Sequence, residues 1–316
     1  MLAVTVDDLH STSAPHTVPD GPVAVLVNPT AGRGRHRSLL PTVLDRLRRA
    51  GRGVRMLDAR TADEAEAACR AAVADGAAAL VAVGGDGTVH LALQPVAGTR
   101  VALGAVPAGT GNDFAISAGL PADPLAAAAA IADALASGRC WPADLASTTA
   151  SDGAHRWYGL VLAAGFDAVV NERANRMRWP RGPRRYDIAI VIELARLRRR
   201  RYVLRLDGQE HHLDAVLVAV GNGPCYGGGM RICPTADPTD GLLDVVVAGP
   251  ISRTTLIRVK PRIYEGTHVT HPMVSCYRAR TVEVDAEGIT SYFDGERGPR
   301  LPVRITAVPG AVRLLR

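Results

Sequence analysis

The run Val81-Ala82-Val83-Gly84-Gly85-Asp86-Gly87-Thr88 decides how the first half of this chain folds. Apolar residues typical of a buried strand lead into three glycines around an aspartate, and a helical pattern follows. Glycines let backbone amides approach a ligand without a Cβ in the way, and the unpaired N–H groups at a helix start attract negative charge. The run therefore predicts a phosphate-binding loop, although a tight strand-to-helix turn without a ligand would look the same.

The segments around this loop alternate between strand and helix patterns. Apolar runs occupy 23–27, 54–57, 78–83 and 101–106, and helical spacing of apolar residues occupies 39–47, 63–74 and 124–135. Ser38 is expected to cap the first of these helices. Strands that are apolar throughout and separated by helices indicate a parallel sheet covered on both faces. We therefore expect a Rossmann-like α/β nucleotide-binding domain in the first half.

Two further loops follow strands of the same predicted sheet. One is the glycine loop Pro107-Ala108-Gly109-Thr110-Gly111-Asn112-Asp113-Phe114, and the other is Asn28-Pro29-Thr30-Ala31-Gly32. Loops at the carboxyl ends of neighbouring parallel strands converge on one crevice. A threonine in each of the three loops offers a hydroxyl to phosphate oxygens: Thr30, Thr88 and Thr110. Three convergent loops predict a shared nucleotide pocket.

The pattern changes beyond about residue 144, where short strand-like segments replace the alternation with helices. These segments are 157–163, 202–206, 215–220, 242–247 and 281–284. Two helical patterns interrupt them, at 188–197 and 252–264. The second half is therefore predicted to be a mostly antiparallel β domain, and two domains agree with a length of 316 residues.

The ends and the composition argue for a cytoplasmic protein. Residues 1–21 lack a basic start and a continuous apolar run, so we expect a flexible tail rather than a secretory signal. No stretch approaches the roughly 18 to 20 apolar residues of a membrane-spanning helix. Five scattered cysteines without a Cys-x-x-Cys pair favour reduced thiols over disulfides or a zinc site. Any contact with lipid is then expected to be peripheral.

The single lysine excludes two well-known ways of binding a triphosphate. Lys260 precedes a proline and lies far from any glycine loop, whereas a P-loop and a protein-kinase site both need a lysine against the phosphates. The charge of a triphosphate must then be met by backbone amides, by Mg²⁺ and by loop arginines. The candidates are Arg33, Arg35 and Arg37, for which an ordinary solvated surface is the alternative.

Taken together, the motifs resemble the diacylglycerol kinase catalytic family, which also contains sphingosine and ceramide kinases. Asn28–Gly32, Gly84–Thr88 and Gly109–Phe114 occur in the family's order and spacing. The likeness continues in the second half and covers roughly residues 22–316. The motifs there are Gly165-Phe-Asp167, Gly227-Gly-Gly229, Pro234-x-Ala236 with Asp240-Gly-Leu-Leu-Asp244, and Phe293-Asp-Gly-Glu296. The stretch 171–180 is similar to soluble actinobacterial diacylglycerol kinases.

The resemblance implies a phosphofructokinase- and NAD kinase-like nucleotide domain, 22–144, completed by a returning final strand within about 303–316. It implies a β-sandwich for 145–302 and a nucleotide between the two domains. Glu296 is then the expected general base and Asp86 a second catalytic residue. The residues expected to bind the nucleotide are Asn28, Pro29, Thr30, Ala31, Gly32, Gly84, Gly85, Asp86, Gly87, Thr88, Val89, His90, Gly109 and Thr110.

The implied cofactors are ATP and Mg²⁺. Asp240, with backbone oxygens of Asp237 and Leu242, matches the family's structural magnesium site, and hard oxygen ligands suit that ion; an aspartate-capped turn is the alternative. The chain departs from the family pattern after Thr88. His90 and Leu91 stand where the family usually has Asn-Glu, so nucleotide affinity or donor choice could differ.

The sequence thus predicts ATP-dependent phosphorylation of a lipid hydroxyl, with diacylglycerol to phosphatidic acid as the leading reaction. A sphingoid base or ceramide as substrate, an NAD kinase-like enzyme and a non-catalytic nucleotide or lipid sensor are the alternatives. The expected partner is an anionic membrane surface at the inner face of the plasma membrane, through Arg178, Trp179, Arg181, Arg184 and Arg185. No nucleic-acid partner is expected, and a homodimer is left open.

Overall fold

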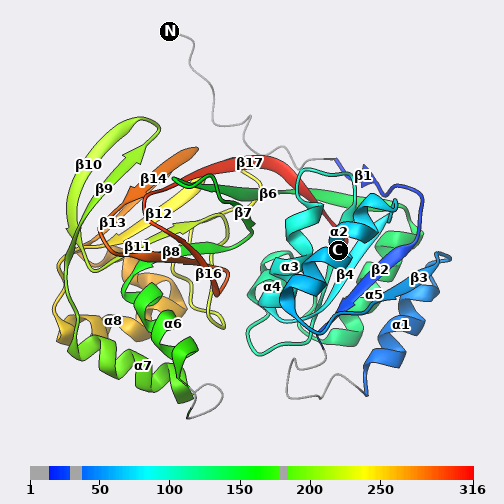
Figure 1. Cartoon of the computed structure of the whole chain (residues 1–316), viewed down its shortest axis with the longest axis horizontal. Helices are drawn as coiled ribbons and strands as arrows, with labels where there is room; N and C mark the ends of the chain where they lie inside the picture. The colour runs from blue at the N-terminus through cyan, green and yellow to red at the C-terminus, as the bar shows by residue number, and fades with distance from the viewer. Residues whose placement is uncertain (1–13, 29–37, 178, 180–183) are drawn as a thin grey trace, which may run out of the picture. The chain divides into compact units, whose positions relative to one another are not determined.

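The computed structural model describes residues 14–28, 38–177, 179 and 184–316 of the chain. These residues divide into two compact units (Figure 1). The first unit contains the chain up to Gly109, Ala118–Asp144 and Pro309–Arg316, and the second contains Thr110–Ser117 and Leu145–Val308. The segment 110–117 thus groups with the second unit, and the C-terminal segment joins the first unit at 309 rather than at about 303.

Part of the segment 1–21, expected to be a flexible tail, forms regular structure. Residues 1–13 lie outside the described residues, but His16–Thr17 forms strand β1, which pairs with Cys140 and Arg139. Val18 is buried, and its N–H donates to the oxygen of Gly138. Strand pairing and the burial of Val18 thus attach this short segment to the first unit.

The first unit is built on a parallel sheet. Its elements are β2 (Val23–Val27), α1 (Leu40–Arg48), β3 (Val54–Leu57), α2 (Ala62–Ala74), β4 (Ala79–Gly84), α3 (Asp86–Val96), β5 (Ala102–Pro107), α5 (Pro124–Ala136), the start of β6 (Arg139–Ala150) and the end of β17 (Val303–Leu314). The strand order is β3-β2-β4-β5-β17, all parallel. Every residue of β4 and β5 is buried, as expected for strands with helices on both faces.

Helices cover the two faces of this sheet in pairs, α1 beside α5 and α2 beside α3 (Figure 1). Thr61 caps α2 and Asp123 caps α5 through side-chain oxygens, which satisfies amides at each helix start. The expected cap at Ser38 is wrong: Leu39 is the capping position of α1 and no side chain bonds there. Pro41 in the first turn needs no amide partner, so a polar cap has less to satisfy.

The second unit contains most of the antiparallel strands. Its elements are α4 (Asp113–Ser117), the rest of β6, β7 (His155–Tyr158), β8 (Val161–Gly165), α6 (Phe166–Arg176), α7 (Arg184–Ala195), β9 (Arg200–Leu206), β10 (Gln209–Ala215), β11 (Leu217–Gly221), β12 (Leu243–Ala248), α8 (Arg253–Glu265), η3 (Thr267–Thr270), β13 (Val274–Ala279), β14 (Thr281–Asp285), β15 (Thr290–Phe293), β16 (Glu296–Arg300) and the start of β17.

Two antiparallel sheets pack against each other in this unit. One has the order β13-β12-β11-β8-β15-β16, and the other runs β10-β9-β14-β17. Alternate residues of both sheets meet in one buried core, for example Leu162 and Val245 from the first sheet and Leu204, Val282 and Ile305 from the second. The second unit is therefore the expected antiparallel β sandwich.

The structure differs from the expected elements mainly in the second half, where strands β10, β13, β15 and β16 were also not predicted. The strand predicted at 157–163 is two strands, because the chain turns at Gly159 and Leu160. Helix α6 was not predicted, and α7 begins earlier than the expected residue 188. None of the described helices is long and apolar enough to cross a membrane.

Candidate functional site

The glycine loop after β4 is held by a very close contact between strand and helix. A Cβ on Gly84 would lie 2.2 Å from Oγ1 of Thr88, so only glycine fits there. Gly85 caps α3 in an extended conformation, and its oxygen accepts hydrogen bonds from Thr88 N and Val89 N at 2.9 and 3.1 Å. The first turn of α3 therefore starts directly at the end of a buried strand.

Three predicted loop positions meet at this edge of the sheet. Asn28 N donates to Val83 O at 3.3 Å, and Ala108 N donates to Gly84 O at 2.8 Å. A Cβ on Gly85 would lie 3.1 Å from the Cα of Gly109. The structure thus brings together Asn28, Gly84, Gly85 and Gly109, as parallel strands require. Backbone amides at such an edge can bind an anion without a lysine.

The remaining predicted nucleotide residues have different surroundings. Asp86 and Gly87 are half-buried in the first turn of α3, and Val89 and His90 are buried on it. His90 Nε2 lies 3.4 Å from the side-chain nitrogen of Gln94. Thr110 belongs to the second unit. Pro29–Gly32 and the arginines at 33, 35 and 37 lie outside the described residues.

Asp113 fastens the triple-glycine turn of the second unit. The residue is 3% exposed, and its carboxylate accepts hydrogen bonds from Gly228 N and Gly229 N, both at 2.7 Å. Gly227, Gly228 and Gly229 all have positive φ, which residues with a side chain rarely adopt. Both motifs were visible in the sequence, but their contact was not, because 115 residues separate them.

The Phe293-Asp-Gly-Glu296 motif is a tight hairpin between β15 and β16. Phe293 pairs with Glu296, and Asp294 and Gly295 both have positive φ, as in a type I′ turn. The Asp294 carboxylate accepts from Gly159 N, Leu160 N and Val161 N at 2.9, 3.0 and 3.3 Å. Glu296 is exposed, and no other described residue forms a hydrogen bond or ion pair with its carboxylate.

The turn predicted to bind magnesium is organised by hydrogen bonds. Asp240 Oδ1 accepts from Leu242 N at 2.9 Å, and Asp240 Oδ2 pairs with Arg278, which also reaches Asp244 Oδ2 at 3.3 Å. Asp237 Oδ1 accepts from Thr239. Carboxylate and carbonyl oxygens are the ligand type that Mg²⁺ prefers. Both carboxylate oxygens of Asp240 are nevertheless engaged, so a cation here would compete with Arg278.

Asp167, in another predicted motif, is a half-buried acid paired with a half-buried phenol. Tyr226 donates its hydroxyl to Asp167 Oδ2. Burial raises the pKa of Asp167 from 3.8 to about 6, against the opposing effect of the Tyr226 hydrogen bond. Tyr226 directly precedes the triple-glycine turn. The Asp167–Tyr226 pair therefore holds one side of this loop, and Asp113 holds the other.

The matches to known families agree with this architecture. Residues 22–147 match the model of the diacylglycerol kinase catalytic domain, and residues 160–316 match the YegS C-terminal NAD kinase beta sandwich-like domain. A solved structure described as a diacylglycerol kinase from Bacillus anthracis strain Sterne has a TM-score of 0.69 at 21% identity, covering 93% of this chain and 96% of that chain. A second structure from that organism has a TM-score of 0.76 at 23% identity. At such identities these two likenesses show the fold.

Curated relatives extend the likeness to the sequence. A diacylglycerol kinase of Mycobacterium tuberculosis strain H37Rv is 45% identical over 298 residues, which are 94% of this chain and 95% of that protein. A Xanthomonas axonopodis pv. citri protein named "Probable lipid kinase YegS-like" is 33% identical over 255 residues, 77% of this chain and 80% of the relative.

Fold and motifs together define a lipid kinase, which is a transferase. The chain belongs to the diacylglycerol kinase family.

The glycine loop can be tested by adding one methyl group. Gly84→Ala should lower the free energy of unfolding by about 1–3 kcal/mol, because the new Cβ collides with Thr88. Gly53→Ala is the matched control, since the nearest atom to its Cβ would be 3.9 Å away. Urea unfolding measures both variants. If both variants lose equally little stability, the loop can shift to accommodate the added methyl group.

The raised pKa of Asp167 predicts that ionisation of this carboxyl lowers the stability of the fold as the pH rises. An acid whose pKa is higher in the folded state contributes stability that is complete below its ordinary pKa and is lost as the pH rises through about 6. Asp167→Asn keeps an acceptor for Tyr226 without a charge. It should raise the free energy of unfolding by about 1–2 kcal/mol at about pH 7 and change it little at about pH 4. Denaturant titrations at both values measure this; a difference independent of pH would contradict it.

Proposed function

We propose that the chain transfers the γ-phosphate of ATP to the hydroxyl of diacylglycerol, forming phosphatidic acid and ADP. The observation that carries this proposal is the 293–296 hairpin, in which Asp294 fixes the turn and Glu296 presents an exposed carboxylate without an ion pair to another described residue. A carboxylate that is not engaged elsewhere can accept the proton of an alcohol. Membership of the family supports the choice of a lipid acceptor.

Phosphate binding is assigned to the glycine edge of the first unit. Amides at the start of α3 and beside Gly109 would meet the negative oxygens, and Asp86 would order the loop or contact the metal through water. Among the described residues, Thr88 Oγ1 is buried without a hydrogen-bond partner, so a nearby phosphate oxygen could satisfy it. His90 replaces an expected polar side chain and is an alternative donor.

The reaction would begin with attack of the lipid oxygen on the γ-phosphorus. Glu296 takes the hydroxyl proton, the new O–P bond forms, and the bond to the β,γ-bridging oxygen breaks, leaving that oxygen on ADP. Magnesium, when bound with ATP, supplies charge neutralisation for the phosphates. Asp237, Asp240 and Leu242 are the proposed ligands of a structural magnesium ion, which would have to displace Arg278 from Asp240.

The proton acceptor and the substrate class can be tested in one assay. Purified protein is given Mg·ATP with labelled γ-phosphate and separately diacylglycerol, ceramide, sphingosine or NAD. Label should appear on diacylglycerol, and Glu296→Gln should lower kcat at least about a hundredfold, within the range attributed to general bases. Glu287→Gln, another exposed glutamate of the second unit, is the control.

Other outcomes of this assay identify the alternatives. Label on ceramide or sphingosine would indicate a different lipid alcohol, and label on NAD would indicate an NAD kinase-like enzyme. No label on any acceptor from folded wild-type protein would refute the kinase proposal and favour a non-catalytic sensor. A fully active Glu296→Gln variant would reject Glu296 as the base.

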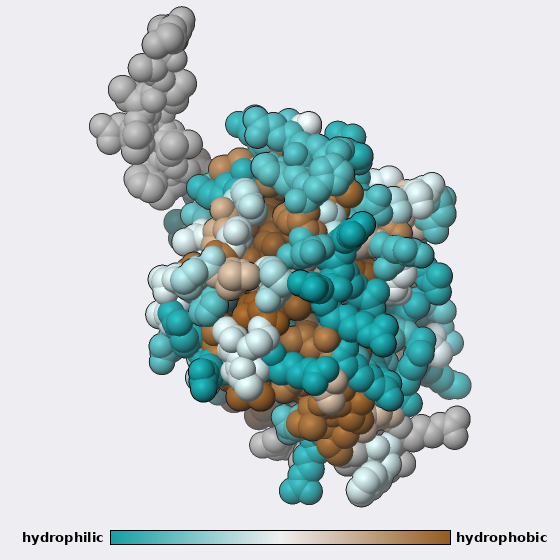
Figure 2. All heavy atoms as spheres, turned by 90° about the vertical axis from the view of Figure 1, so that its left-hand side faces the viewer, coloured by the Kyte–Doolittle hydropathy of each residue, from teal (hydrophilic) through white to brown (hydrophobic). Residues whose placement is uncertain are grey.

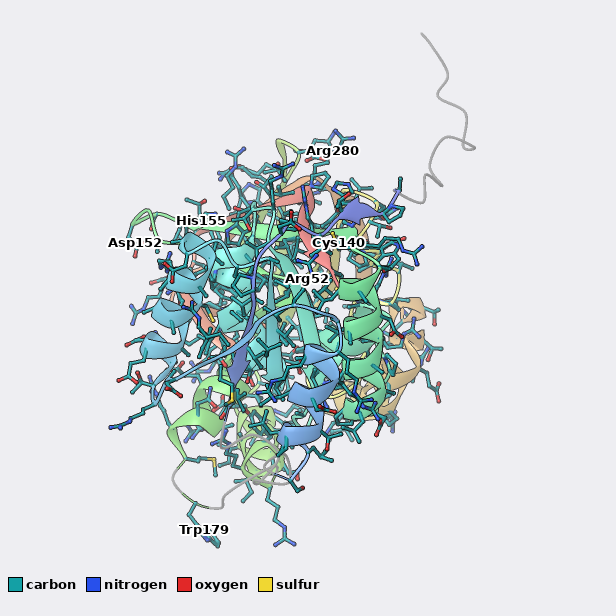
Figure 3. All side chains as sticks on the ribbon, turned by 90° about the vertical axis from the view of Figure 1, so that its right-hand side faces the viewer. Arg52, Cys140, Asp152, His155, Trp179 and Arg280 are labelled. Atoms are coloured by element: carbon teal, nitrogen blue, oxygen red, sulfur yellow. The ribbon has the colours of Figure 1, made fainter. Side chains whose placement is uncertain are left out.

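A peripheral contact with the inner face of the plasma membrane is part of the proposal, because a two-chain lipid stays in the bilayer. Trp179 is 82% exposed and Val191 of α7 is 66% exposed. Arg184 and Arg185 lie at the start of the same helix. Hydrophobic side chains gather at the lower end of the face in Figure 2, and Trp179 projects away from the ribbon in Figure 3. Arg178 and Arg181 lie outside the described residues.

Charge reversal tests this surface. Arg184→Glu/Arg185→Glu should weaken binding to phosphatidylcholine vesicles that contain phosphatidylglycerol by at least about tenfold, since each basic residue near an anionic surface contributes about 1 kcal/mol. Arg48→Glu/Arg49→Glu on α1 changes the net charge equally and is the control. Vesicle sedimentation at low and high salt measures both. Equal loss in the two variants would reject a local patch.

A further inference from the structure

Glu172 of α6 contacts both strands of the hairpin that presents Glu296. Its Oε2 accepts a hydrogen bond from the Tyr292 hydroxyl at 2.5 Å and one from Arg297 Nε at 3.0 Å. Tyr292 and Arg297 are register partners across β15 and β16, so both point to the same face of the hairpin. Along the hairpin, this cross-strand pair comes directly before the pair formed by Phe293 and Glu296.

The other side of the hairpin is fixed independently of Glu172. Asp294 binds three consecutive amides at 159–161, and the Phe293 ring stacks on Tyr158 with a centroid distance of 5.9 Å. These contacts hold the turn and the inner face. On the other face, Asn175 of α6 also hydrogen-bonds the Tyr292 side chain, but Glu172 is the residue that contacts both Tyr292 and Arg297, the residue immediately after Glu296.

The charge and burial of Glu172 suit it to this contact. Its side chain is 22% exposed, and Arg176 of the same helix also pairs with it. The Tyr292 hydrogen bond, followed by Arg297, lowers the pKa of Glu172, so these bonds involve a carboxylate at neutral pH. Helix α6 is itself held against α7 by the ion pair between Arg173 and Glu193. Glu172 thus connects the hairpin to a fixed helix.

We infer that Glu172 is a positioning residue for Glu296: through Tyr292 and Arg297 it holds the hairpin so that the proton acceptor keeps one position. The inference rests on the proposed function of Glu296. A misplacement of about 1 Å at a reacting group can cost about a hundredfold in rate, so a small loss of hairpin order is sufficient. Ground-state binding of ATP and lipid does not need this order.

The test compares Glu172→Ala and Glu172→Gln with the wild type. The alanine variant should lower kcat at least about tenfold while KM for ATP and for diacylglycerol stays within about twofold. The glutamine variant keeps an acceptor for Tyr292 and should recover part of the loss. Amide hydrogen exchange should increase in residues 290–300 of the alanine variant and stay unchanged in the strands of the first unit.

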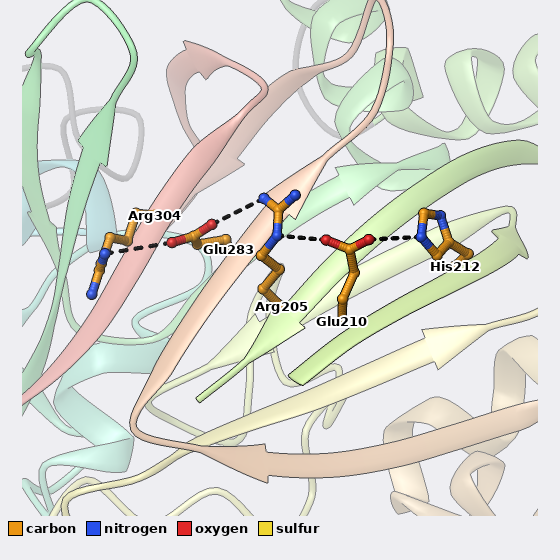
Figure 4. Close-up of polar contacts among 5 residues, drawn as sticks. All are labelled: Arg205, Glu210, His212, Glu283 and Arg304. Atoms are coloured by element: carbon orange, nitrogen blue, oxygen red, sulfur yellow. Dashed lines mark hydrogen bonds and ion pairs between the residues drawn. The ribbon is translucent and has the colours of Figure 1, made fainter. Parts of the chain in front are cut away.

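A matched control comes from the second sheet of the same unit. Glu283 bridges Arg205 and Arg304 in a chain of ion pairs that continues through Glu210 to His212 (Figure 4). Glu283→Gln removes the negative charge that two arginines contact, as either Glu172 variant does, but at a distance along the fold from the hairpin. It should leave kcat and the exchange of residues 290–300 unchanged.

The outcomes separate this inference from the proposed function. Wild-type kcat in Glu172→Ala, or a loss equal to that of Glu283→Gln, would overturn the positioning role while leaving Glu296 as the base. Unchanged exchange at 290–300 would overturn it as well. If the wild type transfers phosphate to no acceptor, the proposed function fails instead, and the exchange result alone then decides whether Glu172 orders the hairpin.

Discussion

The close approach of backbone at Gly84 and Gly85 is the constraint on which the first unit depends. Thr88 lies against Gly84, which has no room for a side chain, and Gly109 lies so close to Gly85 that a side chain there would push the two loops apart. This contact starts α3 directly after a fully buried strand and brings the loop after β5 against it. The packing of small residues, rather than a lysine side chain, shapes the loop. The backbone amides at this edge are therefore available to an anion.

Carboxylates that bind backbone amides are the second organising device. Asp113 holds the triple-glycine turn, Asp294 holds residues 159–161, and Asp207 accepts from Arg280 N and Thr281 N at the end of β9. Charge-assisted bonds of this kind are stronger than neutral ones, and each replaces regular pairing where the chain turns. Acids in sequence motifs of an enzyme can therefore serve the fold as much as the chemistry.

The fold was largely predictable because its signals are local. Apolar runs and helical spacing in the first half give β2, β4, β5, α2 and α5 within one or two residues, and their alternation gives the parallel sheet. The break at Gly159 and Leu160 was not predictable, because the amides of these residues bind Asp294 more than 130 residues later.

The candidate site was predictable only in part, because sequence signals report local structure and several contacts of the site join distant parts of the chain. The positions of Asn28, Gly84 and Gly109 follow from parallel strands ending at one edge. The engagement of Asp240 with Arg278 and that of Glu172 with the hairpin join elements distant in sequence. Spacing within a motif carries no signal of such contacts, so the partners of these acids had to be seen in three dimensions.

Strand β17 has a consequence for how the chain acquires its structure. Its first part pairs with β14 of the second unit, and its last part completes the sheet of the first unit beside β5. During synthesis, an N-terminal fragment therefore carries an unpaired edge on β5 until residues 309–316 have emerged. Exposed edges promote association between chains, so a fragment that ends at residue 144 should aggregate more readily than the full chain.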